Sequence, residues 1–159
     1  MKLFRLDKHL LTGMALIDEQ HRQYGRFVNA FLKVCQTQDR VAEGSLQKAF
    51  TFLHNYAREH LHQEEALMET YDYPAREVHL ERHRFFSAWI EQTASHLSAG
   101  PTSLDQLMKI HYMLIEWFQM HIRSEDRRLT DHLKAVAEER QDGHLLNLIR
   151  GVFSPAPRR

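Results

Sequence analysis

The fold can be worked out from the stretch HLHQEEALM at residues 60–68. His60 and Glu64 stand four residues apart, a spacing that places both side chains on one face of an α-helix. Leu53 and Ala57 precede them at helical spacing, which indicates that this face points inward. The stretch therefore predicts a helix that carries an imidazole and a carboxylate into the protein core.

Three other stretches carry candidate ligands on further helices. HLERH at 79–83 repeats the four-residue spacing with two histidines, IDEQH at 17–21 ends in a histidine, and HIRSED at 121–126 joins a histidine to an aspartate. Apolar flanking residues indicate that these polar side chains also point inward. Each of four predicted helices thus supplies at least one candidate. The seven candidate metal ligands are His21, His60, Glu64, His79, His83, His121 and Asp126.

A shared metal site is the simplest explanation for this set, because burying such groups without partners costs several kcal/mol each. Mixed imidazole and carboxylate ligands suit iron, manganese or zinc, and the set offers no thiolate for an iron–sulfur cluster. A structural zinc ion typically takes four ligands, whereas seven ligands fit two ions when both carboxylates bridge. If one ion takes three histidines and the other takes two, with an oxo or hydroxo group as third bridge, one coordination position stays open for a small ligand.

Long helices with short connections are expected because helix breakers are scarce: glycine is absent between positions 45 and 99, and there are four prolines in all. The sequence predicts an all-α, up-down-up-down four-helix bundle. The expected helices run from Glu19 to Gln38 with Asp18 as N-cap, from the low 40s to Thr70, from Pro74 to Ser98, and from a capping box at Ser103 and Gln106 to Glu138.

Three segments follow from these boundaries. Residues 1–17 lack strong periodicity and are expected to wrap the bundle, which occupies 18–138. Residues 139–159 are expected to hold a short C-terminal helix at His144–Arg150 and a flexible tail that ends in SPAPRR.

The spacing of the last ligand pair predicts an irregular helix. His121 and Asp126 are five residues apart, which places them about 140° apart around a regular α-helix. If both serve one centre, the helix must widen between them. We therefore predict a π-helical turn at this point.

The composition excludes some partners. The 21 acidic residues balance the 21 lysines and arginines, which removes the electrostatic basis for binding nucleic acid or an anionic membrane. One cysteine permits no intrachain disulfide, and the N-terminus makes a poor signal peptide, so a cytoplasmic protein is expected. A monomer is favoured, and Cys35 is expected in the core.

The four quoted strings, in this order and at these separations, resemble the hemerythrin family, in particular its stand-alone bacterial members, the bacteriohemerythrins. The resemblance covers residues 13 to about 133. It implies two iron ions joined by a bridging oxo or hydroxo group. In the implied arrangement His79, His83 and His121 hold the closed iron, His21 and His60 hold the open one, and Glu64 and Asp126 bridge the pair.

The resemblance implies reversible binding of dioxygen for storage, delivery or sensing rather than an enzyme activity. The alternatives are a di-iron enzyme, acting as a peroxidase or removing nitric oxide or peroxide, and an iron-handling protein. Ferritin-like sites use two Glu-x-x-His motifs, and this chain has one match, from Glu59 to His62, which weighs against an oxidase. A secondary peroxidase activity stays open.

An apolar pocket is expected beside the open iron, although each of its walls would serve equally well as ordinary bundle core. The hydroxyl of Tyr24, one turn after His21, either reaches bound oxygen or points along the bundle. Gly25 permits the close approach of a neighbouring helix. His54 and His111 are either partners of the ligands or core residues, and His62 is expected in solvent. The candidate pocket residues are Tyr24, Leu61, Trp117, Phe118 and Ile122.

Overall fold

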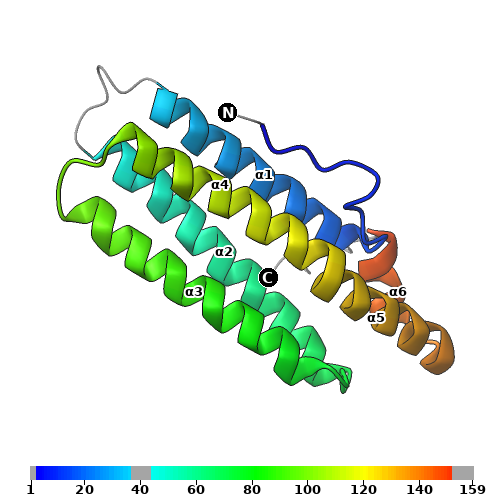
Figure 1. Cartoon of the computed structure of the whole chain (residues 1–159). Helices are drawn as coiled ribbons and strands as arrows, with labels where there is room; N and C mark the ends of the chain where they lie inside the picture. Colours follow the sequence, from blue (N-terminus) through cyan, green and yellow to red (C-terminus); the bar gives the residue numbers. More distant parts are fainter. Residues whose placement is uncertain (1–2, 37–43, 152–159) are drawn as a thin grey trace, which may run out of the picture.

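The computed structural model describes residues 3–36 and 44–151 of the chain. Their regular structure is helical with no strand, and α1 to α4 lie side by side as a bundle in which each helix runs opposite to the one before it (Figure 1). The all-α, up-down-up-down prediction is confirmed. The helices are α1 (Ala15–Gln36), α2 (Ser45–Thr70), α3 (Arg76–Ser98), α4 (Leu104–His121), α5 (Arg127–Arg140) and α6 (Gly143–Arg150), with a π-helical segment η2 (Ile122–Asp126) between α4 and α5.

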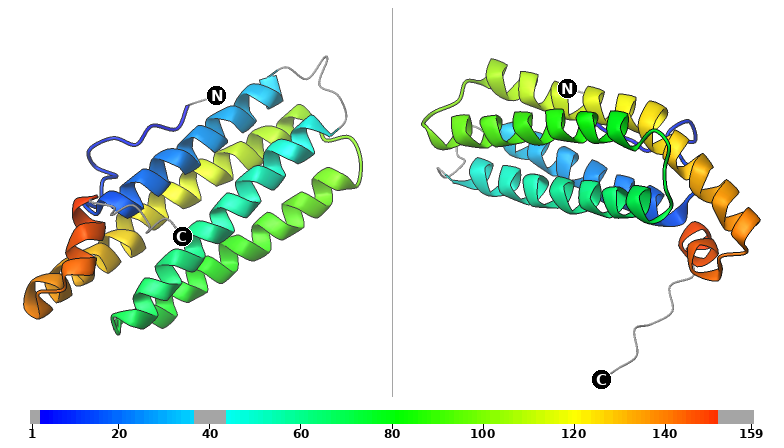
Figure 2. Two further views of the ribbon diagram at one scale, coloured as in Figure 1. Left: turned by 180° about the vertical axis from the view of Figure 1, so that it is seen from behind. Right: turned by 90° about the horizontal axis from the view of Figure 1, so that it is seen from below.

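The fourth predicted helix is a continuous rod made of α4, η2 and α5. Its N-terminus carries the predicted capping box, in which the Ser103 hydroxyl accepts from the Gln106 amide and the Gln106 side chain accepts from Ser103. Figure 2 shows α5 continuing the line of α4, with the predicted short helix α6 folded back beside it. Asp142 caps α6 by accepting from Leu145 N at 3.0 Å. None of the helices described here is long and apolar enough to cross a membrane.

Two helix starts differ from the prediction. Helix α1 begins at Ala15, four residues before Glu19, so Asp18 lies inside the first turn. Its carboxylate accepts from the backbone N–H groups of Thr12 and Gly13, at 2.8 and 3.1 Å, and so closes the preceding loop instead of capping the helix. Helix α3 begins at Arg76 and leaves Pro74 outside it. The expected end at Gln38 and the tail 152–159 lie outside the described residues.

The N-terminal segment is fastened to α1. Phe4 N–H donates to Asn29 Oδ1 at 2.8 Å, and Asn29 Nδ2 donates back to the Phe4 carbonyl at 2.9 Å. The Phe4 ring covers Gly25, where an added Cβ would collide with its Cδ1 atom, and packs against Phe118 at 5.6 Å between centroids. Gly25 was predicted to admit a neighbouring helix. This prediction was wrong, because an aromatic side chain of the wrapping segment occupies that space.

The buried apolar side chains form two clusters, one toward each end of the bundle. On α2, Leu61 belongs to the first cluster and Met68 to the second, and Glu64 stands between them. On the rod, Asp126 stands in the same way between Ile122 and Leu129. A thin polar layer, which contains Glu64 and Asp126, thus separates the two apolar clusters.

Candidate metal centre

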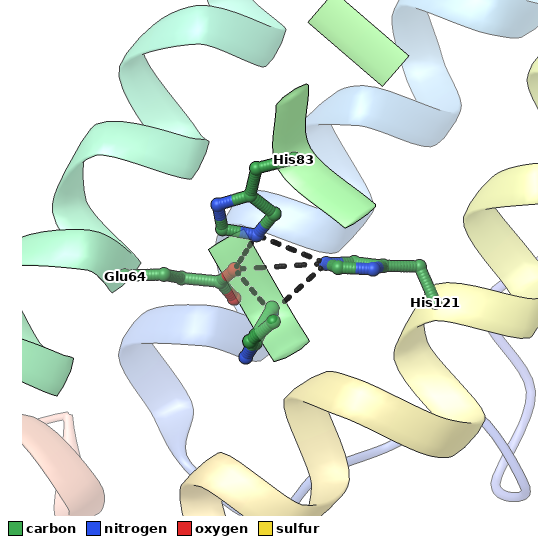
Figure 3. Close-up of side chains that lie close together, drawn as sticks. Glu64, His83 and His121 are labelled. Carbon is green, nitrogen blue, oxygen red and sulfur yellow. Dashed lines mark hydrogen bonds and ion pairs between the residues drawn. The ribbon is translucent and has the colours of Figure 1, made fainter. Parts of the chain in front are cut away.

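Three histidines converge in this polar layer from α3 and α4. Nε2 of His121 lies 3.2 Å from Nε2 of His79 and 3.2 Å from Nε2 of His83. Glu64 approaches from α2, with Oε2 at 3.3 Å from His83 Nε2 (Figure 3). Ligands about 2.1 Å from one ion lie about 3 Å apart at neighbouring octahedral positions, so the three imidazoles are spaced as ligands of one metal ion.

A second group lies on the other side of the two carboxylates and contains His21 and His60. Asp126 Oδ2 is 3.0 Å from His21 Nε2, whereas Oδ1 is 2.9 Å from His121 Nε2. Glu64 likewise turns Oε1 toward His60, at 3.6 Å from Nε2, and Oε2 toward the three-histidine group. Each carboxylate therefore presents one oxygen to each histidine group, as a ligand shared by two ions does.

The site is buried, and several of its polar atoms lack hydrogen-bond partners. All seven side chains are at most 3% exposed. Among the described residues, the carboxylate oxygens of Glu64 and Asp126 have no hydrogen-bond partner. The same is true of both ring nitrogens of His21 and of Nε2 of His60. Such groups are costly to bury alone. The residues present fit a pair of metal ions, which would satisfy the buried atoms together.

The charges of the site favour cations at its centre. Burial lowers the pKa of His60 to about 4, so its imidazole is neutral at pH 7, the state that binds a metal ion. Burial also opposes the charged form of His121, but the surrounding carboxylates, Asp126 first among them, raise its pKa well above the usual value. Burial would raise the pKa of Asp126, yet its contacts with the histidines hold that pKa well below the usual range. Positive charge is thus drawn to the two carboxylates.

Two side chains that the sequence reasoning missed make hydrogen bonds to the histidines, and a third lies close to one of them. Gln20 Oε1 accepts from His60 Nδ1 at 2.9 Å, and Glu65 Oε1 accepts from His83 Nδ1 at 3.0 Å. Glu125 Oε2 lies 3.5 Å from His121 Nδ1. A proton held on Nδ1 leaves Nε2 free to bind a metal ion. The signal was present, since Gln20 and Glu65 each neighbour a ligand in the sequence and Glu125 follows His121 by one helical turn.

The predicted π-helical turn is confirmed. Segment η2 spans Ile122–Asp126, and the Arg127 N–H donates back to the Ile122 carbonyl, five residues earlier. The wider turn brings Asp126 to the face of the rod that carries His121. Without it, the two side chains would point in directions about 140° apart.

The profile of the Hemerythrin HHE cation binding domain matches residues 12–133. The chain belongs to the hemerythrin family. Its metal-binding domain therefore covers α1 to the middle of α5, and all seven converging side chains lie within it. A comparison with curated proteins gave no match.

The predicted pocket residues pack against one another. Phe118 lies edge-on to His21 at 5.2 Å between centroids and is buried in one cluster with Leu61 and Ile122. Trp117 packs against the same cluster and stacks on His121 with 4.4 Å between centroids. That these residues line a pocket for a small ligand stays a prediction.

The hydroxyl of Tyr24 donates to the Leu114 carbonyl at 3.1 Å, and its ring lies tilted by 33° against that of Phe118, with 3.8 Å between centroids. Leu114 lies two helical turns before His121, roughly 10 Å along the helix axis. Of the two alternatives for this hydroxyl, the structure shows the one that points along the bundle.

The remaining candidate side chains lie apart from the centre. His111 is buried, but it precedes His121 by ten residues on α4, roughly 15 Å along the helix. His54 is partly buried six residues before His60, and His62 is exposed beside Glu65. The histidines are instead oriented by the glutamine and glutamates described above. Cys35 is buried in the core as expected, and burial raises the pKa of its thiol to about 11.

Proposed function

We propose that this hemerythrin domain holds two iron ions and binds dioxygen reversibly. His79, His83 and His121 hold one ion, and His21 and His60 hold the other. Glu64 and Asp126 join them, together with an oxo or hydroxo group. The observation that carries the proposal is the position of the two carboxylates, each with one oxygen toward each histidine group.

The unequal number of histidines supports the binding of a small ligand. Three imidazoles and three bridging atoms complete an octahedron, whereas two imidazoles and the same bridges leave one position open. When bound, the iron pair supplies two electrons that dioxygen can accept and return. The open position is on the side of His21 and His60.

The protein itself supplies a dry wall on that side. Phe118 and Ile122 are at most 1% exposed, and Leu61 is 4% exposed. Phe118 also lies 6.3 Å from His60, between ring centroids. Apolar side chains at these positions keep water and protons away from the ligand and so favour its release unchanged.

An optical spectrum tests the proposal. The purified protein is reconstituted with ferrous iron without air, its iron content is measured, and spectra are recorded before air, after air and after argon. A visible charge-transfer band that appears in air and fades under argon supports reversible binding. Binding of fewer than two iron ions per chain would contradict the two-ion centre.

The same experiment separates the alternative functions. Irreversible oxidation within seconds would identify enzyme chemistry on peroxide or nitric oxide in place of oxygen carriage. Ready transfer of the iron to a competing chelator, with no oxygen-dependent band, would identify an iron-handling protein. The buried ligands predict slow transfer, because none of the seven is more than 3% exposed.

A further inference from the structure

A column of parallel aromatic rings runs from the three-histidine group toward the surface. Trp117 stacks on His121 with 4.4 Å between centroids and 15° between planes. Phe86 stacks on Trp117 at 3.7 Å and 3°. Trp89 continues the column beyond Phe86 at 5.9 Å and 13°. Both tryptophans of the chain therefore belong to one stack that begins at a candidate metal ligand.

The column ends at a groove between α3 and α4. Trp89 is half-buried and lines this groove, which has a volume of about 460 Å³. Lys109, His96 and Gln106 contribute polar groups to the same lining. A dissolved molecule can thus reach the outer indole. Trp117 is half-buried as well, and Phe86 between the two indoles is buried.

Core packing alone does not require this choice of residues. Leucine or phenylalanine would fill the same space, whereas indole is among the side chains most easily oxidised by one electron. One indole contacts a candidate metal ligand, the second lies at the surface, and a stacked phenylalanine ring joins them. Each indole can hold the electron vacancy for a time during a transfer between the surface and the metal centre.

We propose that Trp117 and Trp89 carry single electrons from the groove to the metal position on His121 when that position is oxidised by hydrogen peroxide. The electron donor is a phenol. Two phenol molecules each lose one electron and one proton and become phenoxyl radicals. The peroxide gains two electrons and two protons, its O–O bond breaks, and two water molecules form. Both indoles end as they began, so the path adds a peroxidase activity to the domain.

This inference rests on the proposed iron centre, and its first test traces the path itself. The iron-loaded protein is treated with peroxide without phenol, frozen for electron paramagnetic resonance, and digested for mass spectrometry of oxidised tryptophan. We expect a tryptophan radical and oxidation of Trp89. In Trp117→Phe, which keeps a stacked ring, oxidation of Trp89 is lost. Tyr112→Phe, an exposed aromatic outside the stack, behaves as the unaltered protein.

The second test measures phenol oxidation in Trp89→Phe, a change far enough from the ligands to leave iron content and the oxygen-dependent spectrum unaltered. We expect the rate to fall by at least an order of magnitude. An unchanged rate, or equal Trp89 oxidation in Trp117→Phe, overturns the path even if oxygen binding is intact. Failure to take up iron overturns the metal centre and the path together. If the protein takes up iron and Trp89 is oxidised as expected, but oxygen does not bind reversibly, the result supports the electron path and contradicts the proposed oxygen binding.

Discussion

At the scale of single residues, hydrogen bonds fix the orientation of two of the candidate ligand histidines. Gln20 fixes the ring of His60 by accepting from Nδ1 at 2.9 Å, and its own Nε2 donates to Gln63. Gln20 lies in the first half of α1 and also lines a groove between α1 and α2 that reaches His60. Gln20 therefore holds a buried candidate ligand from a position near the surface.

We predict that Gln20→Ala weakens iron binding at the two-histidine position by roughly 10- to 100-fold, the usual effect of removing such a partner. Competition with a chelator, followed by iron analysis, measures the change. Gln23→Ala is the matched control, because Gln23 lines the same groove but bonds only weakly to Glu19, at 3.5 Å. Equal affinities in the two variants would remove Gln20 from the site.

A second residue-scale prediction concerns Tyr24. Its hydroxyl is bonded to the Leu114 carbonyl and turned away from the histidines. Tyr24→Phe should therefore lower the free energy of unfolding by about 1 kcal/mol, the net value of one such bond, and leave the rate of oxygen release unchanged. Urea unfolding and stopped-flow release measure the two effects. A faster release would show that the hydroxyl acts on the ligand after all.

At the scale of elements, the N-terminal segment packs against α1 at a glycine, where the absence of a side chain makes room for an aromatic ring. Gly25 lies inside α1, where alanine would ordinarily be better by about 1 kcal/mol. The ring of Phe4 occupies the space of its missing Cβ. We predict that Gly25→Ala destabilises the protein, but that the same change stabilises a Phe4→Ala variant. Urea unfolding of the four proteins gives the coupling, and a stabilising Gly25→Ala in both backgrounds would refute the fit.

The π-helical segment is the second feature of this scale. A π-turn is equivalent to one residue inserted in an α-helix. Deletion of Arg123, an exposed residue of η2, would put His121 and Asp126 four residues apart on one face of a regular helix. We predict that this shortened protein still binds two iron ions. Deletion of the exposed Tyr112 from regular α4, in contrast, shifts the helix register and should abolish iron binding. Iron analysis decides, and loss of iron in both would refute the insertion argument.

At the scale of the whole molecule, the sequence predicted the four antiparallel helices and the convergence of seven side chains. Helical spacing determines which residues share a face of a helix, and the inward-pointing faces are enough to predict that these side chains converge. Spacing does not determine rotamers, so it could not show that the Tyr24 hydroxyl bonds Leu114 or that Trp117 stacks on His121. Asp18 was misplaced for a related reason, because its partners are the amides of a loop that has no periodicity.

The polar layer gives a last prediction, which concerns how much iron stabilises the fold. Glu64 is fully buried and neither of its carboxylate oxygens has a hydrogen-bond partner among the described residues. A buried carboxylate without a hydrogen-bond partner costs free energy, and an apolar side chain of similar size removes that cost. With a chelator present, Glu64→Leu should therefore unfold at the same or a higher urea concentration than the unaltered protein.

Ferrous iron should reverse that order. Binding to the folded state alone adds about 2.7 kcal/mol when free iron is at 100 times its dissociation constant, and Glu64→Leu should gain much less because a shared ligand is gone. Anaerobic urea unfolding with iron or chelator measures both effects. Glu59→Leu, an exposed change on the same helix, should gain as much as the unaltered protein. An equal gain in all three proteins would mean that iron stabilises the fold without Glu64, and the shared-carboxylate arrangement would have to be abandoned.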